Sequence, residues 1–184
     1  MAWLNATNIG SSEYTCGWCN NRVATPNGFV TQGTVGYKIY ICPHCDRPTA
    51  FVDRKQTPGI AYGAAVGHLP PDISALYSEA RNCTAASCYT AAVLICRKLL
   101  MNIAVSQGAQ PGGTFISYVE YLSSSGYVPP NGKGWVDHIR KKGNEATHEI
   151  ILMSQSDAQE LISFAEMLLK FIYEFPSRVP AGNA

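Results

Sequence analysis

The sequence predicts a mainly α chain in which a helical bundle follows a small β module, and three observations support this fold class. Of the 184 residues, 46% are apolar and only 15% are charged, as in a chain that folds around a core. Short strand-prone runs separated by turn residues precede Pro70. After Pro71, apolar residues recur every three or four positions, as on amphipathic helices. The length suits one ordinary domain with a small accessory module.

Residues 1–53 are expected to form the β module. Thr25–Gly28 has the composition of a turn. Strand-prone runs occur at Arg22–Val23, Phe29–Thr31, Tyr37–Ile41 and Thr49–Val52. Residues 54–70 contain several glycines and prolines, which interrupt regular structure, and are expected to be a linker.

Residues 71–176 are expected to form the helical bundle. Asp72 is a candidate N-cap of a first helix, a second helix is expected over about 85–105, and Thr114 is a candidate N-cap of a third. A fourth helical stretch is expected over 135–148.

The last helix is expected to begin at a capping box. Ser156 is followed three residues later by Gln159, a spacing at which each side chain bonds the backbone N–H of the other residue. Pro176 is expected to end this helix, which leaves residues 177–184 as a loose C-terminal tail.

Four of the seven cysteines form two Cys-x-x-Cys pairs, Cys16 with Cys19 and Cys42 with Cys45. A gap of two residues lets both thiolates of a pair reach one metal ion, and two pairs complete the tetrahedral sulfur set that zinc favours. Four ligands close the coordination sphere, so a structural Zn²⁺ in a zinc ribbon is expected. A redox dithiol is the alternative, and the presence of two such pairs together disfavours it.

A zinc ribbon binds nucleic acid, binds protein or braces a neighbouring domain, and the sequence leaves these roles open. Metal binding would supply much of the folding free energy of so small a module. His44 lies inside the second pair and is expected to be an exposed residue that does not bind the metal.

The net charge of +1 provides no overall basic field, so a nucleic-acid contact would need a local patch. Lys133, His138, Arg140, Lys141 and Lys142 fall within ten residues and form such a patch. The three lysines are therefore candidate nucleic-acid contacts. An ordinary solvated helix face is the alternative.

The N-terminal residues lack the basic and apolar regions of a secretory signal. The apolar stretches are interrupted by charges and fall short of the roughly 20 residues of a membrane span. The chain is therefore expected to be cytoplasmic, without membrane contact, and its cysteines to be metal ligands or buried thiols rather than disulfides.

Arg140, Asn144 and His148 recur at four-residue spacing. In a helix, four residues advance about 400°, so the three side chains drift only about 40° per step and share one stripe. Arginine binds phosphate through a planar fork of donors, and histidine exchanges a proton near neutral pH. The stripe is a candidate site for binding and cleaving a phosphodiester. A polar helix face with a hydrogen-bonded histidine is the alternative.

The helical part also resembles the domain-of-unknown-function family 4145, over roughly residues 70–175. The segment Gly143–His148 is the most specific part of this resemblance. The other matching segments are Pro70–Ile73, Tyr77–Ala80, Tyr89–Arg97, Trp135, Arg140–Lys142, Ser156–Ala158, Leu168–Leu169 and Phe171–Tyr173. An N-terminal zinc ribbon is a common companion of this domain.

The family is grouped with the HEPN clan of helical bundles, many of which look like metal-independent ribonucleases. The resemblance implies that Arg140 stabilises the scissile phosphate, His148 activates the 2′-hydroxyl of RNA and Asn144 supports them. It also implies a homodimer, because two copies of the clan's motif build one site. The sequence departs from that motif in one respect, since seven residues separate Arg140 from His148 where the clan has four to six.

Two hypotheses about function follow. The first is a HEPN-like RNA-binding or metal-independent endoribonuclease domain with a structural zinc ribbon, a homodimer in bacterial or phage-related defence. The second is a non-catalytic module in which the zinc ribbon and the helical bundle bind a protein or DNA partner.

Overall fold

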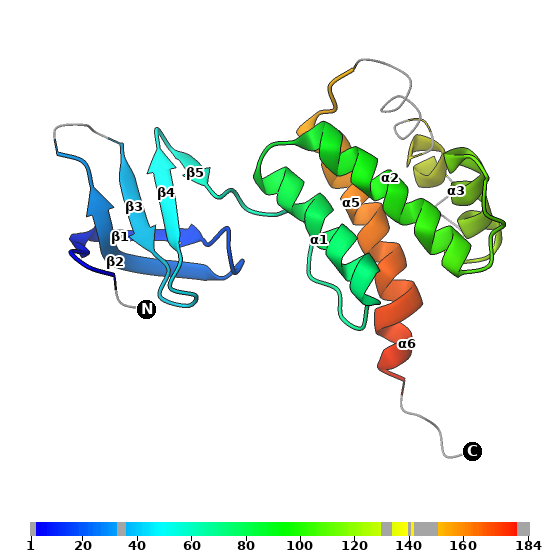
Figure 1. The fold of residues 1–184 in the computed structure, drawn as a ribbon, viewed down its shortest axis with the longest axis horizontal. Coiled ribbons are helices and arrows are strands. Elements are labelled where there is room, and N and C mark those ends of the chain that lie inside the picture. Colours follow the sequence, from blue (N-terminus) through cyan, green and yellow to red (C-terminus); the bar gives the residue numbers. More distant parts are fainter. Residues whose placement is uncertain (1–2, 33–35, 130–133, 140, 142–150, 180–184) are drawn as a thin grey trace. The chain divides into compact units, whose positions relative to one another are not determined.

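The computed structural model describes residues 3–32, 36–129, 134–139, 141 and 151–179. The chain divides into two compact units. The first is Met1–Ala61 with Ala85–Ser87, and the second is Tyr62–Thr84 with Cys88–Ala184. Figure 1 shows the strands in one unit and the helices in the other, so each unit has its own architecture.

The first unit is a five-stranded antiparallel sheet in which each strand pairs with the next along the chain (Figure 1). Its strands are β1 (Thr7–Thr15), β2 (Arg22–Val30), β3 (Lys38–Ile41), β4 (Pro48–Val52) and β5 (Lys55–Thr57). The few buried apolar residues of its main cluster are Tyr14, Cys16, Tyr40 and Cys42, so this unit has a very small core.

The prediction of a mainly α fold class is wrong, because the structure combines this five-stranded sheet with the helices. Strand β1 was not expected, since its sequence does not alternate apolar and polar residues. Strand β2 continues through the expected turn at Thr25–Gly28. It can do so because Pro26 lies where the β1–β2 register is irregular, between the paired residues Thr25 and Asn27. A proline, which has no N–H to donate, is tolerated at such an irregularity.

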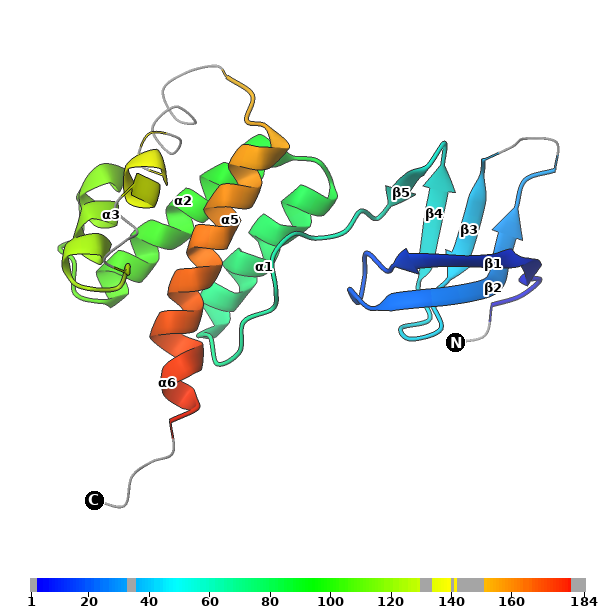
Figure 2. The same cartoon turned by 180° about the vertical axis from the view of Figure 1, so that it is seen from behind.

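The second unit is a bundle of helices (Figure 2). Its helices are α1 (Pro71–Ala85), α2 (Tyr89–Ser106), α3 (Phe115–Ser124) and α5 (Gln155–Leu169), and α5 continues as the π-helix η2 (Lys170–Glu174) and the short α6 (Phe175–Ser177). Helices α2 and α5 pack along each other in both views. The core is one contiguous set of buried apolar side chains, among them Leu99, Leu100, Ile103, Leu122, Ile139, Leu161, Phe164 and Leu168.

Helix α2 is the one described helix whose length and composition would allow it to cross a membrane. Seven of its 18 residues are buried in the bundle, namely Ala92, Val93, Cys96, Leu99, Leu100, Ile103 and Ala104. Packing in the core therefore accounts for the apolar residues on that side of the helix.

Of the two expected N-caps, the structure confirms Thr114 but not Asp72. Thr114 is the N-cap of α3, as predicted, and its side chain accepts a hydrogen bond from the Ser117 amide at 3.2 Å. Helix α1, however, begins at Pro71 and places Asp72 in its first turn. Proline suits this position because the first helical amide has no acceptor within the helix.

The capping box predicted at Ser156 and Gln159 is wrong. The structure has its capping box two residues earlier, where the Ser154 hydroxyl accepts from the Asp157 amide at 3.2 Å. An Asp157 carboxylate oxygen accepts from the Ser154 amide at 2.8 Å. Aspartate thus takes the place that glutamate or glutamine has in the usual pattern.

Residues 62–67, within the expected linker, are hydrogen-bonded to α1 and α5. The carboxylate of Glu166 accepts from the Ala64 amide at 2.8 Å and forms an ion pair with Lys170. The Tyr77 hydroxyl donates to the Ala64 carbonyl at 2.9 Å. Partial burial would raise the pKa of Glu166, but the hydrogen bonds from Lys170 and Ala64 outweigh burial and lower it. The ionised carboxylate therefore fastens this segment to the bundle.

We expect Glu166→Gln to lower the free energy of unfolding of the bundle at pH 7 by about 1–3 kcal/mol, because it removes charged hydrogen bonds. The folded pKa of Glu166 is lowered, so its stabilisation is present above the unfolded value of about 4.3 and is lost as the pH falls through the folded pKa. The difference in the free energy of unfolding between wild type and variant should therefore become smaller at acidic pH. Urea unfolding followed by helical circular dichroism measures it.

Glu160→Gln is the matched control, because this α5 carboxylate pairs with His138 at the surface. It should change the stability by less than about 1 kcal/mol. A Glu166→Gln protein as stable as the wild type at pH 7 would contradict the assignment.

Candidate metal centre

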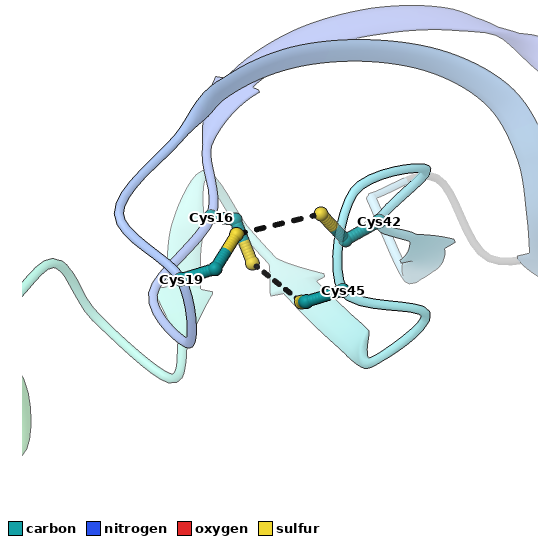
Figure 3. Close-up of side chains that lie close together, drawn as sticks. All are labelled: Cys16, Cys19, Cys42 and Cys45. Carbon is teal, nitrogen blue, oxygen red and sulfur yellow. Dashed lines mark hydrogen bonds between the residues drawn. The ribbon is translucent and has the colours of Figure 1, made fainter.

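The four cysteines of the Cys-x-x-Cys pairs lie in two turns of the sheet unit. Cys16 and Cys19 lie between β1 and β2, and Cys42 and Cys45 lie between β3 and β4. Figure 3 shows the four side chains converging from the two turns. The antiparallel pairing of the strands thus brings together two cysteine pairs that are far apart in the sequence.

The two turns have the same backbone geometry. In each, the amide of the first cysteine donates to the carbonyl five residues later, and the amide four residues later donates back to the cysteine carbonyl. These bonds are Cys16 N to Asn21 O at 2.9 Å, Asn20 N to Cys16 O at 2.8 Å, Cys42 N to Arg47 O at 3.0 Å and Asp46 N to Cys42 O at 2.9 Å. Asn20 and Asp46 have φ values of 60° and 58°, which Asn and Asp tolerate better than most residues. Each turn therefore presents its two sulfurs in the same way.

The sulfur atoms form one compact cluster (Figure 3). The Cys16 and Cys45 sulfurs are 3.7 Å apart, and the Cys19 and Cys42 sulfurs are 3.8 Å apart. All four lie within 4.8 Å of one another. A disulfide bond would need about 2.05 Å. Four thiols at these separations are suited to a single metal ion, and they are the predicted ligands.

The surroundings of the cluster lower the pKa of one thiol and raise the pKa of two others. Burial would raise the pKa of Cys19, but hydrogen bonds from Asn21 and neighbouring thiols outweigh burial and lower it to about 6. Burial raises the pKa of Cys42 and of Cys45. A divalent cation would favour the thiolate form, because it takes the place of the protons and neutralises the negative charge on the sulfurs.

Side chains also join the two turns directly. The Trp18 indole N–H donates to the Pro48 carbonyl at 2.7 Å, and the Arg47 guanidinium lies 5.2 Å from the Trp18 ring centroid. His44 is exposed and its Nδ1 lies 3.2 Å from the Asn21 side-chain amide, so its contact is with Asn21 and not with the sulfur cluster. The two turns are thus held together by contacts other than the sulfurs.

Gly17 and Gln56 support the site, and the sequence did not reveal their role. A Cβ at Gly17 would lie 2.3 Å from the Pro58 carbonyl oxygen and 2.4 Å from that of Gly59. The Gln56 side chain donates to the carbonyls of Thr15 at 2.9 Å and Pro58 at 3.0 Å. The segment after β5 therefore covers the first cysteine turn, a tertiary contact with no signature in the local sequence.

The predicted catalytic residues Arg140, Asn144 and His148 lie outside the described residues, as do Lys133 and Lys142. Of the basic patch, the structure describes Lys141, which is helical and exposed, and His138, which pairs with Glu160 of α5. The geometry of the Arg140–His148 stripe therefore stays a prediction.

Comparison with known proteins identifies one family. Residues 78–182 match the family model of a domain of unknown function (DUF4145). No curated protein and no solved structure matches the chain.

We expect Gly17→Ala to destabilise the sheet unit by about 1–3 kcal/mol, because the added methyl group would meet two backbone oxygens that cannot move independently of the strand. Hydrogen–deuterium exchange of the β1–β5 amides measures the loss. Gly134→Ala is the control, since a Cβ there meets open space. Unchanged protection in Gly17→Ala would show that the segment after β5 does not press on the cysteine turn.

Proposed function

The chain belongs to the DUF4145 family, and we propose that it is an RNA-binding protein in which a structural zinc ribbon accompanies a HEPN-like helical bundle. The observation that carries the metal assignment is the four-sulfur cluster. Support for the RNA-binding part comes from the family resemblance and from Lys141, an exposed residue within a basic run of the sequence.

The sulfur spacing fits zinc. With zinc–sulfur bonds of about 2.3 Å, a tetrahedral site places its sulfurs about 3.8 Å apart. The pairs at 3.7 and 3.8 Å have this separation. Calcium and magnesium require oxygen ligands, which this cluster does not offer. Four protein ligands leave no position for water or substrate, so the zinc has a structural role.

Metal analysis of the purified protein should give about one zinc per chain. We expect Cys42→Ser to lose the metal and to unfold residues 14–52 while sparing the bundle, because metal binding supplies folding free energy to the sheet unit. Cys88→Ser is the matched control, since Cys88 is an exposed cysteine of the helical unit. Iron in place of zinc, or a Cys42→Ser protein that keeps its metal, would refute the assignment.

Residues 134–139 form a helical segment just before the catalytic candidates. Its apolar side packs on the bundle and its polar side is exposed. Trp135 packs edge-on against Phe164 of α5, with the ring centroids 5.0 Å apart, and Val136 and Ile139 are buried. His138 and Lys141 lie on its exposed side. Lys141 is accessible to an RNA backbone, which binds largely through its phosphates.

We propose further that the Arg140–His148 stripe cleaves the bound RNA in a reaction that needs no metal. His148 takes the proton of a ribose 2′-hydroxyl, the 2′-oxygen attacks the adjacent phosphorus, and the bond to the 5′-oxygen breaks. The leaving 5′-oxygen gains a proton, and a 2′,3′-cyclic phosphate remains. Arg140 stabilises the charge on the phosphate oxygens through its planar fork of donors, and Asn144 is a polar support.

Single-stranded RNA incubated with the protein in magnesium-free buffer should yield products ending in a cyclic phosphate. His148→Ala and Arg140→Ala should each reduce the rate by about 10²–10⁴-fold, as expected for loss of a general base or of a phosphate ligand. His68→Ala removes an exposed histidine of the helical unit and should leave the rate unchanged. RNA binding without cleavage would mean that the protein only binds RNA. The absence of both binding and cleavage would refute the proposed function.

A protein partner is a second candidate, and the surface of the sheet unit favours it. Residues 1–61 contain five Lys or Arg and three Asp or Glu, a net charge of +2. A zinc ion with four thiolates contributes −2, so the metal-loaded unit is neutral and has no overall attraction for nucleic acid. Trp18 is 49% exposed beside the metal cluster. Exposed tryptophans of this kind often anchor protein interfaces.

A further inference from the structure

Helix α2 is apolar on two sides. One side is buried in the bundle core, as described above. On the other side Leu94 is 41% exposed and Val105 is 37% exposed, and Met101 is partly buried. This side of α2 also carries polar residues, as a surface helix normally does, so its exposed apolar residues belong to a mixed surface.

This second side forms a groove of about 460 Å³ together with α3. Its lining residues are Leu94, Arg97, Lys98, Met101, Asn102 and Val105 of α2 and Tyr118 of α3. The α2 residues recur at spacings of three and four and span about 16 Å along the helix. A groove of this length accommodates about three turns of a helix from a partner.

Among the described residues that line the groove, the charged ones are the cations Arg97 and Lys98, of which Lys98 is exposed. The Arg97 guanidinium lies 4.6 Å from the centroid of the buried Phe115 ring, which holds it near α3. Met101 in the middle of the stripe has an adaptable side chain of the kind found at protein-binding surfaces.

We propose that this groove binds an acidic amphipathic helix of a partner protein. The apolar side chains of the partner pack between Leu94, Met101 and Val105, and its carboxylates face Lys98. This inference concerns a surface other than the Arg140–His148 segment and does not depend on RNA binding.

The observations disfavour the other occupants. A second copy packed antiparallel on α2 would bring the Lys98 residues of both copies within about one helical turn of each other, and like charges oppose such a contact. RNA binds through basic tracks along its phosphates, whereas much of this groove is aliphatic. A membrane surface is flat, whereas the α2 residues lie in a concavity with Tyr118.

The test uses two synthetic helical peptides of about 16 residues, which span more than three turns. Both carry leucines on one side, and the flanking positions are glutamate in one peptide and lysine in the other. Fluorescence anisotropy with the full chain should show binding of the glutamate peptide at concentrations below about 100 μM and at least about tenfold weaker binding of the lysine peptide.

Lys98→Glu should weaken binding of the glutamate peptide by about tenfold and strengthen binding of the lysine peptide. Leu94→Ser should weaken the binding of both peptides. Lys55→Glu is the matched control, because it makes the same charge change at an exposed residue of the sheet unit and should leave both affinities unchanged.

Three results would overturn the proposal. The first is that the glutamate peptide does not bind, or that its affinity does not respond to Lys98→Glu. The second is that vesicles of phosphatidylcholine and phosphatidylserine bind the chain through Lys98 while the peptide does not, which would assign the groove to a membrane. The third is a dimer in sedimentation that Leu94→Asp dissociates, which would assign it to a second copy.

Discussion

The convergence of four thiol sulfurs is the constraint on which the first unit depends. The sheet encloses few apolar side chains, and two of the four buried residues of its main cluster are themselves cysteines of the metal centre. A core of that size supplies little hydrophobic free energy. Burial raises the pKa of Cys42 and of Cys45, and the proposed zinc ion would neutralise their thiolates and complete the core. On this proposal, folding of the unit and metal binding are one equilibrium.

The helical unit is stabilised in a different way. Its helices share one contiguous apolar core, and the segment before α1 is fastened to it by the partly buried carboxylate of Glu166. On the side of α2 that faces away from this core, Leu94 and Val105 are partly exposed, and the partner helix proposed above would cover them.

How much the sequence predicted depends on whether the determining contacts are local. The two Cys-x-x-Cys pairs and the cap at Thr114 carry their own short-range pattern, and the structure places them as expected. The sequence of strand β1 does not alternate apolar and polar residues, and its pairing with β2 defines the strand. Its own residues therefore could not predict it. Gly17 is required by the approach of Pro58, a contact between segments about 40 residues apart.

We propose that the four cysteines hold one zinc ion. X-ray absorption spectroscopy at the zinc K edge, on protein purified without added metal, tests this assignment most directly. The expected spectrum has four sulfur neighbours at about 2.3 Å and no lighter ligand. A nitrogen or oxygen atom in the first coordination shell, or the absence of zinc from folded protein, would contradict it.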